Sequence, residues 1–259
     1  MAHKAYENTI LSNKINDILT TTVALNEFLN IDTSMTEGAG MKKIVNTYTS
    51  TGDVEALGMG EGNTQGIEVD FTSAEYDVVT YQGKFEFYDE QEMQDPMIVD
   101  TGLKHSTDKM VNKFIALAIA EYKKCSKEIP ASAWDFRSVV SAIAELKLET
   151  KKGLSLYINP QEEAEFSVAL ADNLSYSEDF VRTGYIGSVA GIPVIMSNAV
   201  PAGEAYVASK DAVTLFLKKD TETEYEREAE RRHNKYIVRK FGVVALTDDT
   251  KICRIKVGA

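Results

Sequence analysis

The sequence has few cysteines and prolines and no long apolar run. Its 259 residues include two cysteines, Cys125 and Cys253, which lie far apart and match no disulfide framework or metal motif. No stretch approaches the roughly 18 apolar residues of a transmembrane helix. The first ten residues lack the apolar core of a secretory signal. We therefore expect two reduced thiols in a protein kept in a cytosol-like compartment, or in a particle assembled there, without a membrane.

Histidine is also scarce. His3, His105 and His233 share no metal-ligand spacing with one another or with cysteine, and none is placed as a base for a nucleophile. The glycines of Gly58–Gly62 have neither the Rossmann nor the Walker spacing, so they indicate a flexible loop. Five glutamates alternate along 222–230 and could bind a cation or act as a general acid. Without a calcium-loop motif, a charged edge strand or interface is favoured, and we expect no catalytic residue, cofactor or metal site.

Acidic residues outnumber basic ones by 40 to 28, which gives a net charge of −12. Proteins that grip nucleic acid usually carry a basic patch, so this balance opposes tight DNA binding. The same balance is compatible with a protein that encloses DNA, because a negatively charged inner surface would repel the phosphates. The notable basic clusters are Arg231–Arg232 and Arg239–Lys240. In an acidic protein that assembles, we expect Arg231, Arg232 and Arg239 to meet acids of a neighbouring chain rather than phosphates.

Residues 36–72 predict a long hairpin. The Met41–Tyr48 segment is rich in β-formers, and Ile67, Val69 and Phe71 alternate with acidic residues. The Gly-rich stretch 50–66 between them indicates a projecting tip. Such a hairpin has little to bury by itself, so its tip is expected to contact another subunit. The residues predicted for this contact are Asp53, Val54, Glu55, Leu57, Met59 and Glu61.

The rest of the chain predicts a mixed α+β protein with no repeated βαβ unit. An amphipathic helix is expected near the N-terminus, and a long helix begins at Asp95-Pro96, where aspartate is a good cap and proline suits the first turn. Asp135 is expected to cap another helix. The expected elements are an N-terminal helix over 8–30, a strand over 76–88, helices over 95–127, after 135 and over 161–170, and strands at 154–158, 192–196, 205–209, 212–218, 221–231, 236–246 and 251–257.

Several segments resemble the major capsid proteins of tailed phages that infect Gram-positive bacteria. The segments are Asp211–Lys219, Glu226–Ala229 followed by Asn234–Tyr236, Arg239–Leu246, and Gly187–Asn198 with its Gly-Ile-Pro-Val stretch. The order of elements matches that family along nearly the whole chain. The resemblance implies an α+β fold of the HK97 capsid type.

By this resemblance, each part of the chain has a counterpart in the capsid fold. These are an N-arm at 1–35, an E-loop at 36–74, a peripheral domain with a long spine helix at 75–130, an axial domain at 131–203, and C-terminal strands, mostly peripheral, at 204–259. None of the matching motifs is catalytic, so no active-site residue carries over.

The implied function is a structural subunit of an icosahedral phage head. Its implied partners are copies of itself in pentamers and hexamers, a separate scaffolding protein, a portal, and packaged DNA enclosed without tight binding. The implied location is the virion, assembled in the host cytoplasm. Relatives often begin with a cleavable scaffolding segment, and the start at Met1 suggests a separate scaffold or none. The tip at 50–66 has no lysine for the isopeptide cross-link of some relatives.

Two alternatives stay open at this point. An encapsulin-like shell on the same fold would hold a protein cargo instead of DNA. An enzyme using the carboxylates at 222–230 would be active as a dispersed subunit and would hold those acids in a pocket.

Overall fold

The structure is a computed structural model that describes residues 6–7, 23–37, 40–173 and 188–258. The expected N-terminal helix over 8–30 lies mostly outside this range. Its last part is the short helix α2 (Val23–Phe28), which is followed by strand β2 (Asn30–Asp32). Cys125 and Cys253 are free thiols, as expected.

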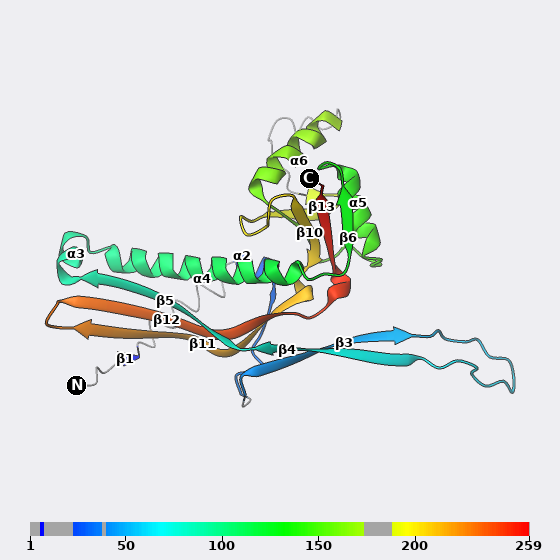
Figure 1. The fold of residues 1–259 in the computed structure, drawn as a ribbon, viewed down its shortest axis with the longest axis horizontal. Coiled ribbons are helices and arrows are strands. Elements are labelled where there is room, and N and C mark those ends of the chain that lie inside the picture. The colour runs from blue at the N-terminus through cyan, green and yellow to red at the C-terminus, as the bar shows by residue number, and fades with distance from the viewer. Residues whose placement is uncertain (1–5, 8–22, 38–39, 174–187, 259) are drawn as a thin grey trace.

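One lobe is built on a five-stranded sheet in which long β-strands lie beside a long helix (Figure 1). Its order is β1-β11-β12-β5, with β2 parallel to β11. The strands are β1 (Tyr6–Glu7), β5 (Val79–Tyr88), β11 (Val213–Glu228) and β12 (His233–Leu246). Helix α4 (Ile98–Tyr122) packs along the sheet because Leu103, Phe114 and Ala118 form one buried stripe. At 1.5 Å per residue, its 25 residues span about 37 Å.

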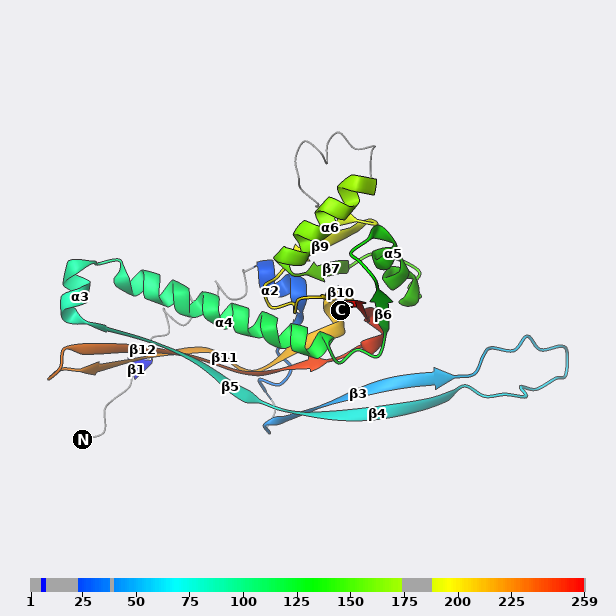
Figure 2. The ribbon, with the colours of Figure 1, turned by 45° about the horizontal axis from the view of Figure 1, so that its top comes forward.

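A second lobe surrounds a six-stranded sheet (Figure 2). Its order is β6 (Glu128–Ala131), β13 (Ile252–Val257), β10 (Glu204–Ser209), β7 (Leu154–Ile158), β9 (Ile192–Met196) and β8 (Ser188–Val189). Helices α5 (Phe136–Glu145) and α6 (Pro160–Asn173) belong to this lobe. Asp135 caps α5 as predicted, since its side chain accepts a hydrogen bond from the backbone of Arg137.

Three buried tyrosines join the two lobes. Tyr122 of α4 lies with its ring centroid 5.4 Å from that of Tyr157 in β7 and 6.0 Å from that of Tyr206 in β10. The Tyr122 hydroxyl donates to the carbonyl of Phe28, and the Tyr157 hydroxyl donates to that of Glu27 at 2.5 Å. One buried cluster therefore contains side chains of both lobes, and α2 packs within it, while the six-stranded sheet has a second cluster of its own.

The hairpin consists of β3 (Lys42–Thr51) and β4 (Glu68–Asp77), which confirms the predicted pair of strands. It extends away from both lobes, with its tip far from the remainder of the chain (Figures 1 and 2). The two strands pair with each other and with no other strand of the described residues. The prediction that this segment projects is confirmed.

Some predicted boundaries were wrong. The long helix begins at Ile98, because Asp95 is extended and its carboxylate accepts a hydrogen bond from the Met97 backbone at 2.9 Å. It ends at Tyr122 rather than near 127. A short helix, α3 (Asp89–Gln94), was missed. The expected strands at 212–218 and 221–231 form the single strand β11, which passes through register shifts between Leu217 and Glu222. Two 3₁₀ turns, η1 (Lys210–Ala212) and η2 (Asp249–Lys251), lie at the lobe junction.

Candidate assembly surfaces

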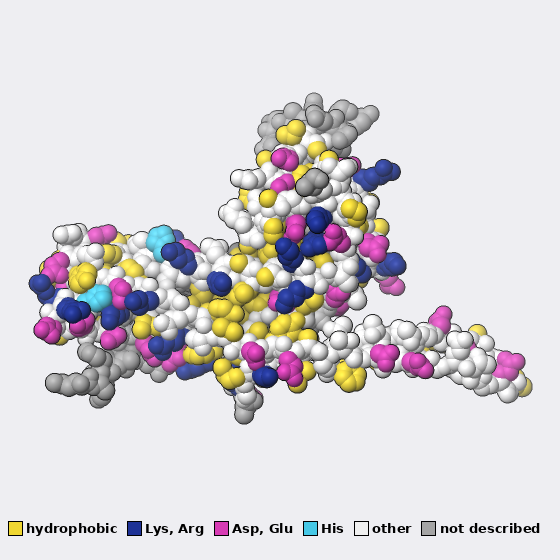
Figure 3. Space-filling model, in the orientation of Figure 1, with side chains coloured by type: hydrophobic (Ala, Val, Ile, Leu, Met, Phe, Trp, Pro, Cys, Tyr) yellow, Lys and Arg dark blue, Asp and Glu magenta, His cyan; other side chains and the backbone are white. Residues whose placement is uncertain are grey.

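The predicted contact residues lie together at the projecting hairpin tip. Val54 and Met59 are almost completely exposed, and Leu57 is about half exposed. On the face in Figure 3, the projecting part of the hairpin carries acidic and hydrophobic side chains. Residues 52–67 include no lysine or arginine. The tip therefore presents apolar and negatively charged groups to a partner surface.

Two glutamates of the tip form hydrogen bonds within the loop itself. The Glu55 carboxylate accepts from the Thr64 backbone at 2.8 Å and from its hydroxyl at 2.5 Å. These bonds from Thr64 hold the pKa of the Glu55 carboxyl below its usual value. The Glu61 carboxylate accepts from the Gly58 backbone at 3.0 Å. Glu55 and Glu61 therefore give the loop its shape, a role that sequence reasoning missed.

The strands of the hairpin carry an apolar stripe. It consists of Ile44, Tyr48, Val69 and Phe71, which are 56–65% exposed. Tyr48 lies directly opposite Phe71, with ring centroids 6.2 Å apart, so the stripe lies on one face. A two-stranded hairpin has no second layer to cover such a face. The alternation at 67–71 indicated a strand, but the uncovered face was not predicted.

The predicted arginines each have an acid in their own chain. The pairs are Arg231–Glu228 at 3.3 Å, Arg232–Glu90 at 2.6 Å and Arg239–Glu224 at 2.8 Å. The side chains of Arg231 and Arg232 stay mostly exposed, whereas that of Arg239 is about a quarter exposed and also donates to Gln82 at 2.8 Å. Each of the three therefore has an acidic partner in its own chain, and their contact with a neighbouring subunit stays a prediction.

The glutamate row of 222–230 is distributed among separate ion pairs. Glu222 lies 3.1 Å from Lys219, and Glu226 lies 3.9 Å from Lys235. Glu230 lies in the turn after β11. Among the described residues, no group of three or more His, Cys, Asp or Glu side chains could hold a metal ion. In the same part of the chain, no helix is both long and apolar enough to cross a membrane.

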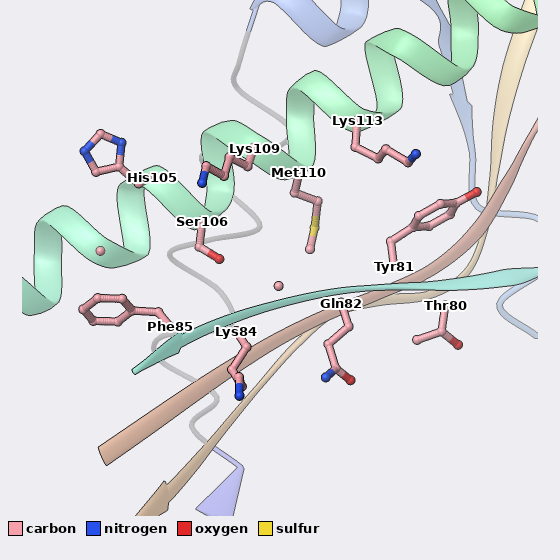
Figure 4. Close-up of a pocket in the computed structure, with 12 residues that line it drawn as sticks. Thr80, Tyr81, Gln82, Lys84, Phe85, His105, Ser106, Lys109, Met110 and Lys113 are labelled. Atoms are coloured by element: carbon pink, nitrogen blue, oxygen red, sulfur yellow. The ribbon is translucent and has the colours of Figure 1, made fainter. Parts of the chain in front are cut away.

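A groove of about 750 Å³ lies between α4 and β5 (Figure 4). Sequence reasoning missed it, because it depends on how the helix lies against the strand. Among the described residues that line it, four are lysine or histidine and none is acidic. The lining consists of Thr80, Tyr81, Gln82, Gly83, Lys84, Phe85, Gly102, His105, Ser106, Lys109, Met110 and Lys113.

A second hollow, of about 470 Å³, lies where α3 meets the far end of the long sheet. Asp89 lines this hollow and accepts hydrogen bonds from Asn234 at 2.6 Å and from Arg227 at 2.7 Å. Both bonds lower the pKa of the Asp89 carboxyl. All three polar groups have partners here, so this network holds α3 against β11 and β12.

No protein-family model matches the chain. Among solved structures, the capsid of the cyanophage P-SCSP1u has a TM-score of 0.66 and 11% sequence identity, covering 88% of this chain and 86% of that one. The holo encapsulin complex from Synechococcus elongatus PCC 7942 has a TM-score of 0.62 and 11% identity, covering 88% and 85%. These matches confirm the predicted α+β, HK97-type fold, so the chain is a protein of the HK97-type capsid fold.

The sequence itself is similar to a "Major capsid protein" of Staphylococcus phage phiMR11, with 28% identity over 123 residues. The match covers 46% of this chain and 45% of the phage protein, so it spans less than half of that relative. It confirms the resemblance to phage major capsid proteins that the segments of the C-terminal half indicated.

Proposed function

We propose that the chain is a structural subunit, and not an enzyme, which self-assembles through pentamers and hexamers into an icosahedral phage head around double-stranded DNA. The observation that carries this proposal is the projecting hairpin, whose apolar stripe and tip are exposed and have no covering layer among the described residues. Large exposed apolar patches mark interaction sites in stable proteins. The fold and the similarity to a phage capsid protein support the same conclusion.

The parts of the chain take corresponding roles in this proposal. Residues 36–74 act as the E-loop, 75–130 with α4 as the peripheral domain, and 131–203 as most of the axial domain, while 1–35 forms the N-arm. Of the strands in 204–259, β11 and β12 lie in the long sheet beside α4, and β10 and β13 lie in the second sheet. The C-terminal segment therefore connects both lobes.

The proposed partners follow from this role. Copies of the same chain form the shell, with a separate scaffolding protein and a portal to direct its assembly in the host bacterial cytoplasm. The net charge of −12 favours DNA that is enclosed by the wall without tight phosphate contacts. In the finished particle, the subunit is located in the capsid of the virion.

A shell around a protein cargo is the second candidate, since an encapsulin complex shares the fold. Particles purified from the native source separate the two candidates. A phage head contains DNA that resists nuclease until the shell is opened. An encapsulin-like shell contains a defined protein and no genome.

The hairpin carries the proposal, so deletion of its tip is the direct test. Replacing residues 53–63 with a two-residue turn removes the exposed tip and leaves both lobes unchanged. The subunit should keep its circular dichroism spectrum and melting temperature, because the deleted side chains bury little. Shell formation should fail or give fragile particles. Tip-deleted subunits whose shells are as stable as the parent's would overturn the assignment of the hairpin as the intersubunit clamp.

A further inference from the structure

The groove between α4 and β5 follows the open edge of the long sheet. Within the described residues, β5 pairs only with β12, so its other edge is unpaired. The side chains of Tyr81 and Phe85 point toward the helix (Figure 4). Those of Gln82 and Lys84 point away from it, and yet both sets line the groove. The groove therefore runs along the strand edge, where free N–H and C=O groups accept an extended peptide as a further strand.

A row of cations on α4 accompanies this edge. His105, Lys109 and Lys113 follow one another at intervals of four residues, so they lie on one side of the helix. Within the described residues, Lys109 and Lys113 have no acidic partner. Lys84, across the groove, is already paired with Glu86 at 2.8 Å. In a chain of net charge −12, this exposed row attracts an anionic ligand.

The spacing of this row matches that of an extended peptide. Helix and strand run side by side in opposite directions, because Ser106 lies next to Gly83 and Gly102, one turn earlier, lies next to Phe85. Four residues of a helix advance about 6 Å. Two residues of a strand advance about 6.6 Å. A strand added to β5 would therefore place every second side chain opposite successive members of the row, and acids at alternate positions would match all three.

The apolar part of the lining favours glutamate at those positions. Tyr81, Phe85 and Met110 lie between the strand edge and the outer side of the helix. The methylene groups of a glutamate would contact these side chains while its carboxylate reaches the lysines. The other face of the added strand would lie beside Thr80 and Gln82, which suit small polar residues that favour strands.

The glutamates of this chain that could supply such acids are engaged elsewhere. In the hairpin tip, the Glu55 carboxylate accepts a hydrogen bond from the Thr64 backbone at 2.8 Å, and that of Glu61 accepts from the Gly58 backbone at 3.0 Å. Three of the alternating glutamates of β11 form ion pairs within their own sheet. Acids of a different protein therefore complement the groove better than these groups do.

We propose that the α4–β5 groove binds an extended acidic segment of a different protein, which adds to β5 as a strand and presents glutamates at alternate positions to His105, Lys109 and Lys113. Hydrogen bonds to the β5 edge supply affinity, and the ion pairs determine the register. This inference goes beyond the proposed function, because it concerns a single subunit and a partner of another sequence.

A designed peptide tests the contact on the full-length chain, kept below the concentration at which it assembles. The probe is a fluorescein-labelled peptide of alternating glutamate and threonine, and the measurement is fluorescence anisotropy. A peptide of the same composition, with all glutamates before all threonines, is the matched control. The alternating peptide should bind at least about tenfold more tightly, and methylation of its backbone nitrogens should remove this advantage. Equal affinities of the alternating and block peptides would overturn the proposal, because charge alone would then be recognised.

Substitutions in the cation row provide a second, independent measurement. Lys109→Gln with Lys113→Gln should weaken binding of the alternating peptide by at least about tenfold and reduce its dependence on salt. Lys104→Gln, an exposed change on α4 outside the groove lining, should leave the affinity unchanged. All of these lysines are exposed, so the circular dichroism spectra should be the same. An unchanged affinity in the double variant would also overturn the proposal.

Two other occupants of the groove would give different results, and either would overturn the proposal. If the tip of a second copy fills the groove, the concentrated parent chain would exclude the peptide, whereas the tip-deleted chain at the same concentration would bind it. If nucleic acid is the ligand, a single-stranded oligothymidylate of equal charge would bind more tightly than the peptide. Shell formation is not measured in these experiments, so their failure would leave the proposed function standing.

Discussion

At the scale of single residues, Gly242 lies in β12 at a position where a side chain would collide with β11. It lies opposite Leu217 of β11 and Val79 of β5. A Cβ atom there would lie 2.8 Å from the carbonyl oxygen of Phe216, a backbone atom that cannot move aside cheaply. Gly242→Ala should lower the free energy of unfolding by about 1–3 kcal/mol, as overpacking does. Urea unfolding of the dispersed subunit measures this.

Gly62→Ala is the matched control for that substitution. A Cβ atom at Gly62 would have no other atom within 4 Å, and the residue lies in the exposed hairpin tip. Its stability should equal the parent's. Equal stabilities of the Gly242→Ala and Gly62→Ala chains would show that β11 and β12 are not packed as described.

Lys240 is a buried charge in the long sheet. Its side chain is 2% exposed and lies 3.6 Å from the Asp220 carboxylate. Burial lowers its pKa, an effect that Asp220 offsets only in part. Because the folded-state pKa is below the unfolded value, the contribution of Lys240 to stability is full above the unfolded pKa and is lost as the pH falls through the folded pKa. At neutral pH the charged, buried lysine therefore lowers the free energy of unfolding.

Lys240→Met should remove this destabilising buried charge. The free energy of unfolding at neutral pH should stay equal or rise, by up to about 1–4 kcal/mol as in other replacements of buried ions. The gain over the parent should shrink as the pH is raised toward the ordinary lysine pKa. Thermal melting of both chains between neutral and alkaline pH measures it. A loss of stability that is the same at every pH would contradict the account, because it would assign to Lys240 a packing role only.

The partners of the charged residues could not be predicted from the sequence. The spacing of Glu224 and Glu228 showed that they share a face, but not that Arg239 and Arg231 of the same chain would meet them. That depends on the register between β11 and β12, which local sequence does not fix. The arginines were expected to meet acids of a neighbouring chain, and the sequence did not show that each also pairs with an acid of its own chain.

At the scale of elements, the apolar stripe of the hairpin should contribute to assembly and not to folding. Tyr48 and Phe71 are 65% and 64% exposed, so replacing both with threonine removes little buried surface and keeps a residue that favours strands. Tyr48→Thr with Phe71→Thr should leave the melting temperature of the subunit within a few degrees. The yield of shells, measured by sedimentation, should fall sharply.

Thr47→Ser with Thr72→Ser changes the opposite face of the same paired strands and is the control. Its shell yield should match the parent's. Equal yields from both double variants would mean that the stripe is not an interface.

The elements themselves were largely predictable, because periodicity and caps are local signals. The hairpin, the helix after Asp135 and most strands follow from alternation and from a single capping residue. Helix α3 was missed because its acidic segment has no apolar stripe, and what holds it is a set of tertiary contacts with β5, α4, β11 and β12. The groove depends on Gly83 lying close to Ser106 and Gly102 lying close to Phe85, which are tertiary contacts without a local signal.

At the scale of the whole molecule, the net charge predicts that the subunit has a low affinity for DNA. A net charge of −12 leaves few surfaces that could neutralise phosphates. Dispersed subunits should therefore retain little DNA on a filter at near-physiological salt. Strong retention of DNA that falls steeply as the salt concentration rises would contradict a shell that encloses DNA without binding its phosphates tightly.

We expect copies of this chain to assemble into a closed shell. Negative-stain imaging of the purified protein at high concentration and near-physiological salt, with sedimentation of the same sample, tests it most directly. Closed particles of uniform size should carry nearly all of the protein mass. A protein that stays a stable monomer at high concentration under these conditions would contradict it.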